Sequence, residues 1–179
     1  MKNQSVFHLI SDCTHEHGVS CVLIGGFAIN HYRVTRQTAD VDFLITKEDF
    51  GKIVGLLEQA GYKKALLQEN FVQLQSSRLS LLDVDFMFVD HETIAKIIKE
   101  GERLKIVGQT FIVPSLHHLI ALKLHSIKHN AKIRLTKDLP DIINLIRINE
   151  LDVKEKKFKE LCLKYGTKEI YDKILEAVK

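Results

Sequence analysis

Residues 20–45 read SCVLIGGFAINHYRVTRQTADVDFLI, and this stretch decides the fold. Its first apolar run stops at Gly25 and Gly26, which is typical of a buried strand that enters a tight turn. The next residues, 27–33, have the spacing of one or two helical turns, and residues 40–45 have the composition of a second strand. The stretch therefore predicts a strand, a glycine turn, a short helix and another strand.

The second predicted strand carries two carboxylates on one face. Side chains alternate between the faces of a strand, so Asp40 and Asp42 share a face while Val41 and Phe43 lie on the other. Two like charges in an apolar strand are costly unless a cation lies between them. Carboxylate oxygens select Mg²⁺ or Mn²⁺. The pair therefore predicts a divalent metal site, and an edge strand with both acids in solvent is the alternative.

The same pattern recurs in residues 82–88, which read LDVDFMF. Asp83 and Asp85 share one face of this predicted strand, and the opposite face is apolar. If the strand lies beside residues 40–45, three or four carboxylates converge. Such an arrangement is typical of phosphoryl-transfer sites, where two metal ions about 3.5–4 Å apart hold the attacking and leaving oxygens. Asp83 and Asp85 remain alternatives for the third carboxylate.

The remaining chain predicts an α+β half and a helical half, divided near Pro114. In residues 1–114 we expect a mixed β-sheet core flanked by helices, and in residues 115–179 a helical subdomain. Before Pro114 the expected helices are 5–16, 46–60 and 91–100, and the expected strands are 71–76, 80–89 and a hairpin over 103–113. After it, a helix that begins at Ser115 is followed by helices over 136–148, 153–165 and 167–177.

Composition narrows the class of protein. Of 179 residues, 45% are hydrophobic and 27% are charged, which predicts a globular chain without a membrane span. The three cysteines form no CxxC pair and the first residues lack a secretory pattern, so we expect a cytoplasmic protein. Residues 120–179 hold 14 Lys and Arg against nine Asp and Glu. This excess suits a partner that carries phosphates, although solvated helix faces explain it equally simply.

The stretch from Gly25 to Phe43 resembles the signature of the DNA-polymerase-β-like nucleotidyltransferase superfamily: a GG or GS turn, a short helix, an Asp-x-Asp pair and a third Asp on a later strand. The intervening Arg36-x-Thr38 is similar to the minimal, abortive-infection toxin (AbiEii-like) branch. The helical motif of that branch is matched by Lys123, Arg134, Lys137, Asp138 and Asp141. The resemblance covers about residues 25–145.

The resemblance implies a Mg²⁺- or Mn²⁺-dependent nucleotidyltransferase that moves an NMP from an NTP to an acceptor hydroxyl and releases pyrophosphate. It implies that Gly25 and Gly26 hold the triphosphate and that Asp40 and Asp42 ligate the metals. Asp85 would be the third carboxylate, preferred to Asp83 because three apolar residues follow it. The expected acceptor is RNA such as a tRNA end, a protein side chain or an antibiotic hydroxyl. A cognate antitoxin is an expected partner if the chain is half of a toxin–antitoxin pair.

Two cations are further candidates for nucleotide binding. Lys123 lies in an otherwise apolar helix, where it either reaches a phosphate or extends along the helix margin into solvent. Arg36 either pairs with Asp40 or Asp42 or fastens the nucleotide. A salt-bridge set of Lys137 with Asp138 and Asp141 is the structural explanation of the later motif.

Other functions receive less support from the sequence. His118, His125 and His129 fall on one helical stripe, but no HExxH motif or nearby cysteine supports a zinc site. The alternative to an enzyme is a non-catalytic nucleotide-binding module with the same fold. A chain that retains all three carboxylates favours the enzyme.

Overall fold

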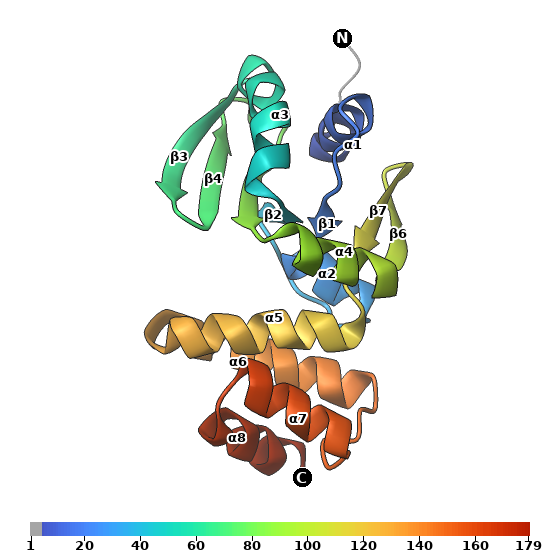
Figure 1. Ribbon diagram of the computed structural model, residues 1–179, viewed down its shortest axis with the longest axis vertical. Helices are drawn as coiled ribbons and strands as arrows, with labels where there is room; N and C mark the ends of the chain where they lie inside the picture. Colours follow the sequence, from blue (N-terminus) through green and yellow to red (C-terminus); the bar gives the residue numbers. More distant parts are fainter. Residues whose placement is uncertain (1–4) are drawn as a thin grey trace. The chain divides into compact units, whose positions relative to one another are not determined.

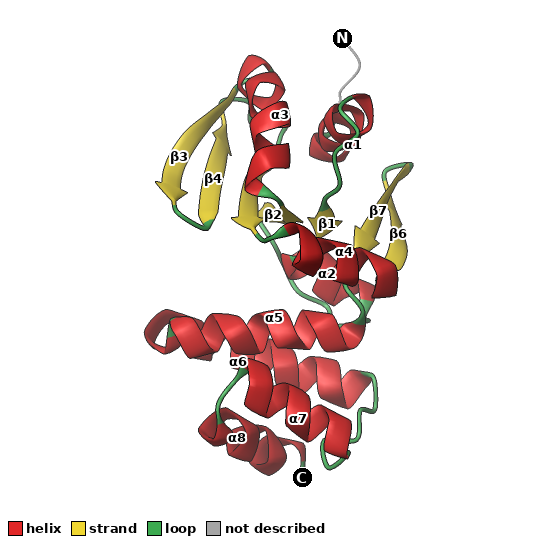
Figure 2. Cartoon of the chain, in the orientation of Figure 1, coloured by secondary structure: helices red, strands yellow, loops and turns green. Residues whose placement is uncertain are grey.

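The computed structural model describes residues 5–179, which form two compact units (Figure 1). The first unit contains the described residues up to Ala28 and Gln37–Ser115. The second contains Ile29–Arg36 and Leu116–Lys179. All strands of the described chain lie in the first unit, and the second is helical (Figure 2).

A seven-stranded mixed sheet forms the centre of the first unit. Its strand order is β3-β4-β5-β2-β1-β7-β6. β2 pairs in parallel with β5 and antiparallel with β1, so the strand of the first Asp-x-Asp pair is central. This mixed sheet confirms the expected α+β class. The strands are β1 (Val22–Leu23), β2 (Asp40–Ile45), β3 (Tyr62–Gln68), β4 (Phe71–Ser76), β5 (Asp83–Phe88), β6 (Glu102–Ile106) and β7 (Gln109–Val113).

The register of β2 against β5 places the two Asp-x-Asp pairs side by side. Asp40 lies opposite Asp83, and Asp42 lies opposite Asp85. Because directly paired residues share a face of a sheet, all four carboxylates extend from one face. The expected adjacency of these two strands is therefore confirmed.

The other face of the sheet forms the core of the unit. Phe43 and Phe86 are fully buried there, with ring centroids 5.8 Å apart. The ring centroids of Phe50 in α3 (Lys47–Gln59) and Phe86 lie 5.1 Å apart, and those of Phe7 in α1 (Val6–Glu16) and Phe111 lie 5.8 Å apart. Apolar packing thus fixes β2 and β5 from one side and leaves the carboxylates on the other. The helices of this part of the chain are α1 (Val6–Glu16), α2 (Gly25–His31), α3 (Lys47–Gln59) and α4 (His91–Glu100).

Local sequence chemistry explains where several elements begin. Thr46 accepts a hydrogen bond from the Asp49 N–H at 3.1 Å and caps α3, as its position in the sequence predicts. The glycine turn differs from expectation, because α2 begins at Gly25 and both glycines form its first turn. β3 was not expected: of its side chains only Tyr62 is buried, so its sequence, YKKALLQ, shows no alternation.

The second unit is built from four helices and the segment 29–36. Leu124, Ile142, Phe158 and Ile174 are buried in its centre. Arg33 donates to the Ile148 carbonyl at 3.1 Å, which ties the segment to these helices. The helices are α5 (Leu116–His129), α6 (Ala131–Ile148), α7 (Lys156–Tyr165) and α8 (Lys168–Val178). α6 begins earlier than the expected residue 136 and includes Pro140.

Within residues 5–179, none of the helices combines the length and apolarity needed to cross a bilayer.

Candidate active site

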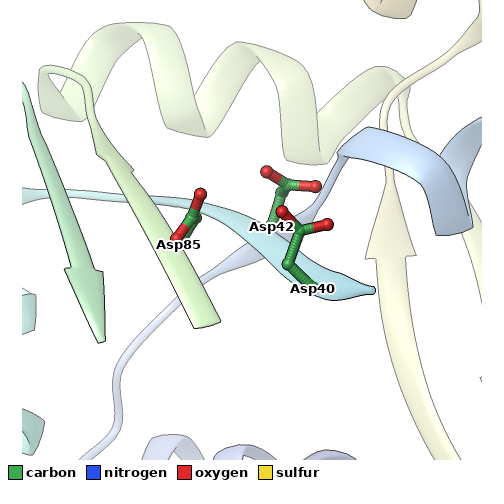
Figure 3. Close-up of side chains that lie close together, drawn as sticks. All are labelled: Asp40, Asp42 and Asp85. Atoms are coloured by element: carbon green, nitrogen blue, oxygen red, sulfur yellow. The ribbon is translucent and has the colours of Figure 1, made fainter. Parts of the chain in front are cut away.

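Three carboxylates converge on the face of the sheet opposite the aromatic core. Asp40 and Asp42 extend from β2 and Asp85 extends from β5, toward one another (Figure 3). One oxygen from each lies within 4.8 Å of the others. Asp40 and Asp42 are half-buried, and Asp85 is the most buried of the three. In the described part of the chain, no other group of three Asp, Glu, His or Cys side chains lies this close together.

The two candidates for the third carboxylate, Asp83 and Asp85, have different surroundings. Asp83 shares the face of Asp85, but its Oδ1 accepts a hydrogen bond from the Ser76 N–H at 2.8 Å. It is therefore engaged with the backbone of β4, and the close group contains Asp85. Near Asp83, the Tyr62 hydroxyl donates a hydrogen bond to the Leu82 carbonyl at 2.7 Å. Burial, together with the Asp83 charge, raises the pKa of Tyr62 to about 12, so this hydroxyl keeps its proton.

The two glycines pack directly against β2. Gly25 has a φ of +63°, and a Cβ there would overlap the Asp42 carboxylate. A Cβ at Gly26 would lie 2.6 Å from the Thr38 Cβ. The Ile24 N–H donates to the Asp42 carbonyl at 2.9 Å and joins the turn to the strand. Only glycine fits at these positions without displacing the carboxylates or their neighbours.

Two neutral side chains orient individual carboxylates. The Thr38 hydroxyl donates to Asp40 Oδ1 at 2.9 Å, and the Gln73 amide donates to Asp85 Oδ2 at 3.1 Å. Neither Thr38 nor Gln73 is among the site residues that the sequence predicts. Thr38 lies in the Arg-x-Thr segment before the Asp pair, which was a usable signal. Gln73 is one polar residue in an alternating strand, and only the pairing of β4 with β5 brings it to Asp85.

The donor set fits a divalent cation. Three carboxylates within 4.8 Å repel one another unless positive charge lies between them. Oxygen ligands of this kind suit Mg²⁺ or Mn²⁺, and neither thiol nor imidazole belongs to the group. The arrangement could hold metal ions next to the glycine turn.

The two predicted nucleotide-binding cations lie in the second unit and form ion pairs there. The Lys123 ammonium is buried and lies 2.7 Å from both Asp138 Oδ1 and Asp141 Oδ2. The Arg36 guanidinium pairs with Asp141. The Arg36 partner that the structure shows is Asp141 of α6, in the same unit, and a pairing of Arg36 with Asp40 or Asp42 stays a prediction. Lys123 does not extend into solvent, and it takes the place expected for Lys137 beside these two carboxylates.

Sequence comparison links the chain to nucleotidyltransferases. A family model described as "Uncharacterised nucleotidyltransferase" matches residues 6–179. No protein with a curated description matches the sequence.

Structural comparison finds the same fold in several nucleotidyltransferases. ANT(2″)-Ia in complex with adenylyl-2″-tobramycin is 18% identical with a TM-score of 0.65, and the match covers 89% of this chain and 94% of that one. Lincosamide antibiotic adenylyltransferase LnuA with bound lincomycin is 16% identical (TM-score 0.54; 78% and 93% covered). A putative nucleotidyltransferase from Thermotoga maritima is 16% identical (TM-score 0.52; 73% and 89% covered). At sequence identities this low, the structural matches show similarity of fold alone.

Proposed function

The chain belongs to the family described as uncharacterised nucleotidyltransferases, and from this premise we propose that it transfers an NMP from an NTP to an acceptor hydroxyl with release of pyrophosphate. One observation carries the proposal: carboxylate oxygens of Asp40, Asp42 and Asp85 lie within 4.8 Å of one another. Phosphoryl transfer depends mainly on positioning and charge neutralisation, and divalent cations held by these three carboxylates would supply both.

In this proposal the carboxylates bind metal and the glycines bind the triphosphate. Asp40 and Asp42 would hold the metals, and Asp85 would complete the ligand set and receive the acceptor hydroxyl beside it. Bound Mg²⁺ or Mn²⁺ neutralises phosphate charge and stabilises the attacking and leaving oxygens. Gly25 and Gly26 present backbone without side chains, which suits close approach by the triphosphate.

Arg36 and Lys123, the two predicted nucleotide ligands of the second unit, already form ion pairs with carboxylates. Arg36 remains a predicted nucleotide ligand, since about a third of its side chain is exposed (34%) while Asp141 holds its guanidinium. The Lys123 charge is already balanced by Asp138 and Asp141. For Lys123 to bind nucleotide, as the sequence predicts, its ammonium would have to leave these partners.

The acceptor and the narrower family branch stay predictions. RNA, a protein side chain and a small-molecule hydroxyl are all retained, as is a cognate antitoxin. The solved structures of ANT(2″)-Ia and LnuA contain adenylyl-2″-tobramycin and lincomycin, which supports including antibiotic hydroxyls among the acceptors to be tried. Three clustered carboxylates favour an enzyme over a binding module, because nucleotide binding alone does not require all of them.

The first test is binding of the donor. Thermal unfolding of the purified chain is followed with each of the four NTPs, with and without Mg²⁺. We expect one NTP or more to raise the midpoint only when metal is present, because a ligand of the folded state stabilises it. If no NTP shifts the midpoint in the presence of Mg²⁺ or Mn²⁺, the proposal is contradicted.

The second test is transfer. The stabilising NTP, labelled at its α-phosphorus, is incubated with metal and with a tRNA pool, with the protein alone, or with aminoglycosides and lincosamides. We expect label to move to one acceptor class, and the Asp42→Asn variant to leave it on the NTP. Equal transfer by parent and variant would show that the carboxylate group is not the site.

A further inference from the structure

The Gln73 side chain reaches the carboxylate group from β4. Gln73 lies directly opposite Asp85 in the antiparallel pairing, and its Nε2 donates to Asp85 Oδ2 at 3.1 Å. An ionised carboxylate only accepts hydrogen bonds, so the contact also fixes the orientation of the amide, NH₂ toward Asp85. The side chain is half-buried, which limits competition from water.

Two contacts fasten the β3–β4 hairpin, which carries Gln73. Asp83 accepts the Ser76 N–H at 2.8 Å at the end of β4. The Tyr62 hydroxyl, at the start of β3, donates to the Leu82 carbonyl at 2.7 Å. Both contacts fasten the β3–β4 hairpin to the beginning of β5. Because a slip of one residue would turn Gln73 to the other face, this fastening matters for the site.

Apolar packing and the strand ladder fix β4 beside β5. Val72 and Leu74 are buried in the core, and residues 71–74 pair with residues 84–87 of β5. The contacts of Asp83 and Tyr62 fasten the other end of the hairpin, beyond this ladder. The two acids of the second Asp-x-Asp pair therefore have different partners. Asp85 belongs to the carboxylate group, and Asp83 accepts a backbone hydrogen bond.

We propose that Gln73 is a positioning residue for the metal site and that Asp83 fastens the end of the strand that carries Gln73. The inference rests on the proposed function, because it assumes that Asp85 is a metal ligand. Gln73 holds Asp85 in the orientation that brings its carboxylate near Asp40 and Asp42. Residues that hydrogen-bond to metal ligands typically contribute 10- to 100-fold in metal affinity.

The test measures metal binding directly. Mn²⁺ is titrated into the metal-free chain and free Mn²⁺ is followed by electron paramagnetic resonance. We compare the parent with Gln73→Met, which keeps the length but removes the donor. Gln75→Met is the matched control, because Gln75 lies two residues along the same strand and is exposed. We expect about tenfold weaker Mn²⁺ binding in Gln73→Met and unchanged binding in Gln75→Met.

Activity separates positioning from a general structural role. At saturating Mn²⁺ we expect Gln73→Met to recover a kcat near that of the parent, since all three carboxylates remain. A kcat that stays low at saturating metal, with unchanged Mn²⁺ affinity, overturns the inference. If the parent itself binds no Mn²⁺, the proposed function is contradicted. If the parent and Gln73→Met bind Mn²⁺ equally well, only the inference about Gln73 is contradicted.

Two substitutions test Asp83. Asp83→Asn keeps an oxygen that can accept the Ser76 N–H, so we expect Mn²⁺ binding close to that of the parent. Asp83→Ala removes the acceptor and should weaken binding as Gln73→Met does. If Asp83→Asn abolishes Mn²⁺ binding while circular dichroism shows a folded chain, Asp83 is itself a ligand and the inference is wrong.

Discussion

At the scale of single residues, Asp42 has close neighbours on two sides. It lies opposite Asp85, and Gly25 packs against its carboxylate. Asp42→Asn keeps its shape and removes one of three clustered charges. We expect unfolding to occur at the same temperature or slightly above it, because like-charge repulsion falls. Metal-dependent transfer should be lost. A variant that keeps parental activity contradicts the assignment of Asp42.

Gly25 is the second residue with a sharp prediction. Gly25→Ala places a Cβ on the Asp42 carboxylate at a φ of +63°. We expect a loss of about 1–2 kcal/mol in the free energy of unfolding from the backbone alone and weaker Mn²⁺ binding from the displaced carboxylate. Denaturant titration measures the first and Mn²⁺ titration the second.

A glycine in α3 is the matched control for this substitution. A Cβ at Gly55 meets no atom within 4 Å. Gly55→Ala should stabilise the chain by about 0.5–1 kcal/mol, because alanine favours helix interiors. Equal effects of the two substitutions would contradict the close approach at Gly25.

At the scale of elements, a buried ion-pair cluster joins α5 and α6. The Lys123 ammonium lies 2.7 Å from Asp138 and Asp141, and all three side chains are buried. Lys123→Met leaves Asp138 without its cation. We expect a loss of about 3–5 kcal/mol in the free energy of unfolding, as is usual when one partner of a buried pair is removed.

An exposed pair in α8 provides the control for Lys123. Lys168 lies 2.6 Å from Asp172, and both side chains are largely exposed. Lys168→Met should leave the free energy of unfolding almost unchanged, because solvent screens such pairs. Similar losses for Lys123→Met and Lys168→Met would mean that the buried cluster does not hold the two helices together.

Elements whose chemistry is local could be predicted from the sequence. Residues 40–45 form a strand with both acids on one face, and Thr46 caps the following helix. β3 could not be predicted in the same way, because its exposed side chains remove the alternating pattern that marks a strand.

Contacts between distant residues set the limit of prediction. The Gln73–Asp85 bond depends on the register of two strands, and the pairing of Arg36 with Asp141 joins residues 105 positions apart. The sequence supplied the types of these residues but no signal of their partners.

At the scale of the whole molecule, the three cysteines differ in exposure: Cys13 and Cys162 are buried and Cys21 is half-buried. Desolvation raises the pKa of both the Cys21 and the Cys162 thiol to about 12. At pH 8, far below that value, both remain protonated and react slowly, since the thiolate is the nucleophile. We expect iodoacetamide to label the folded chain slowly and the chain in guanidinium rapidly, as measured by mass spectrometry. Fast labelling of Cys162 in the folded chain would contradict the packing of the second unit.

The central claim is that Asp40, Asp42 and Asp85 hold divalent metal. Crystals of the chain grown or soaked with Mn²⁺ and a non-hydrolysable NTP analogue give anomalous difference density at the metal positions. We expect peaks within ligand distance of these three carboxylates, next to the glycine turn of Gly25 and Gly26. Mn²⁺ peaks elsewhere on the chain, with none among the three carboxylates, would contradict the claim.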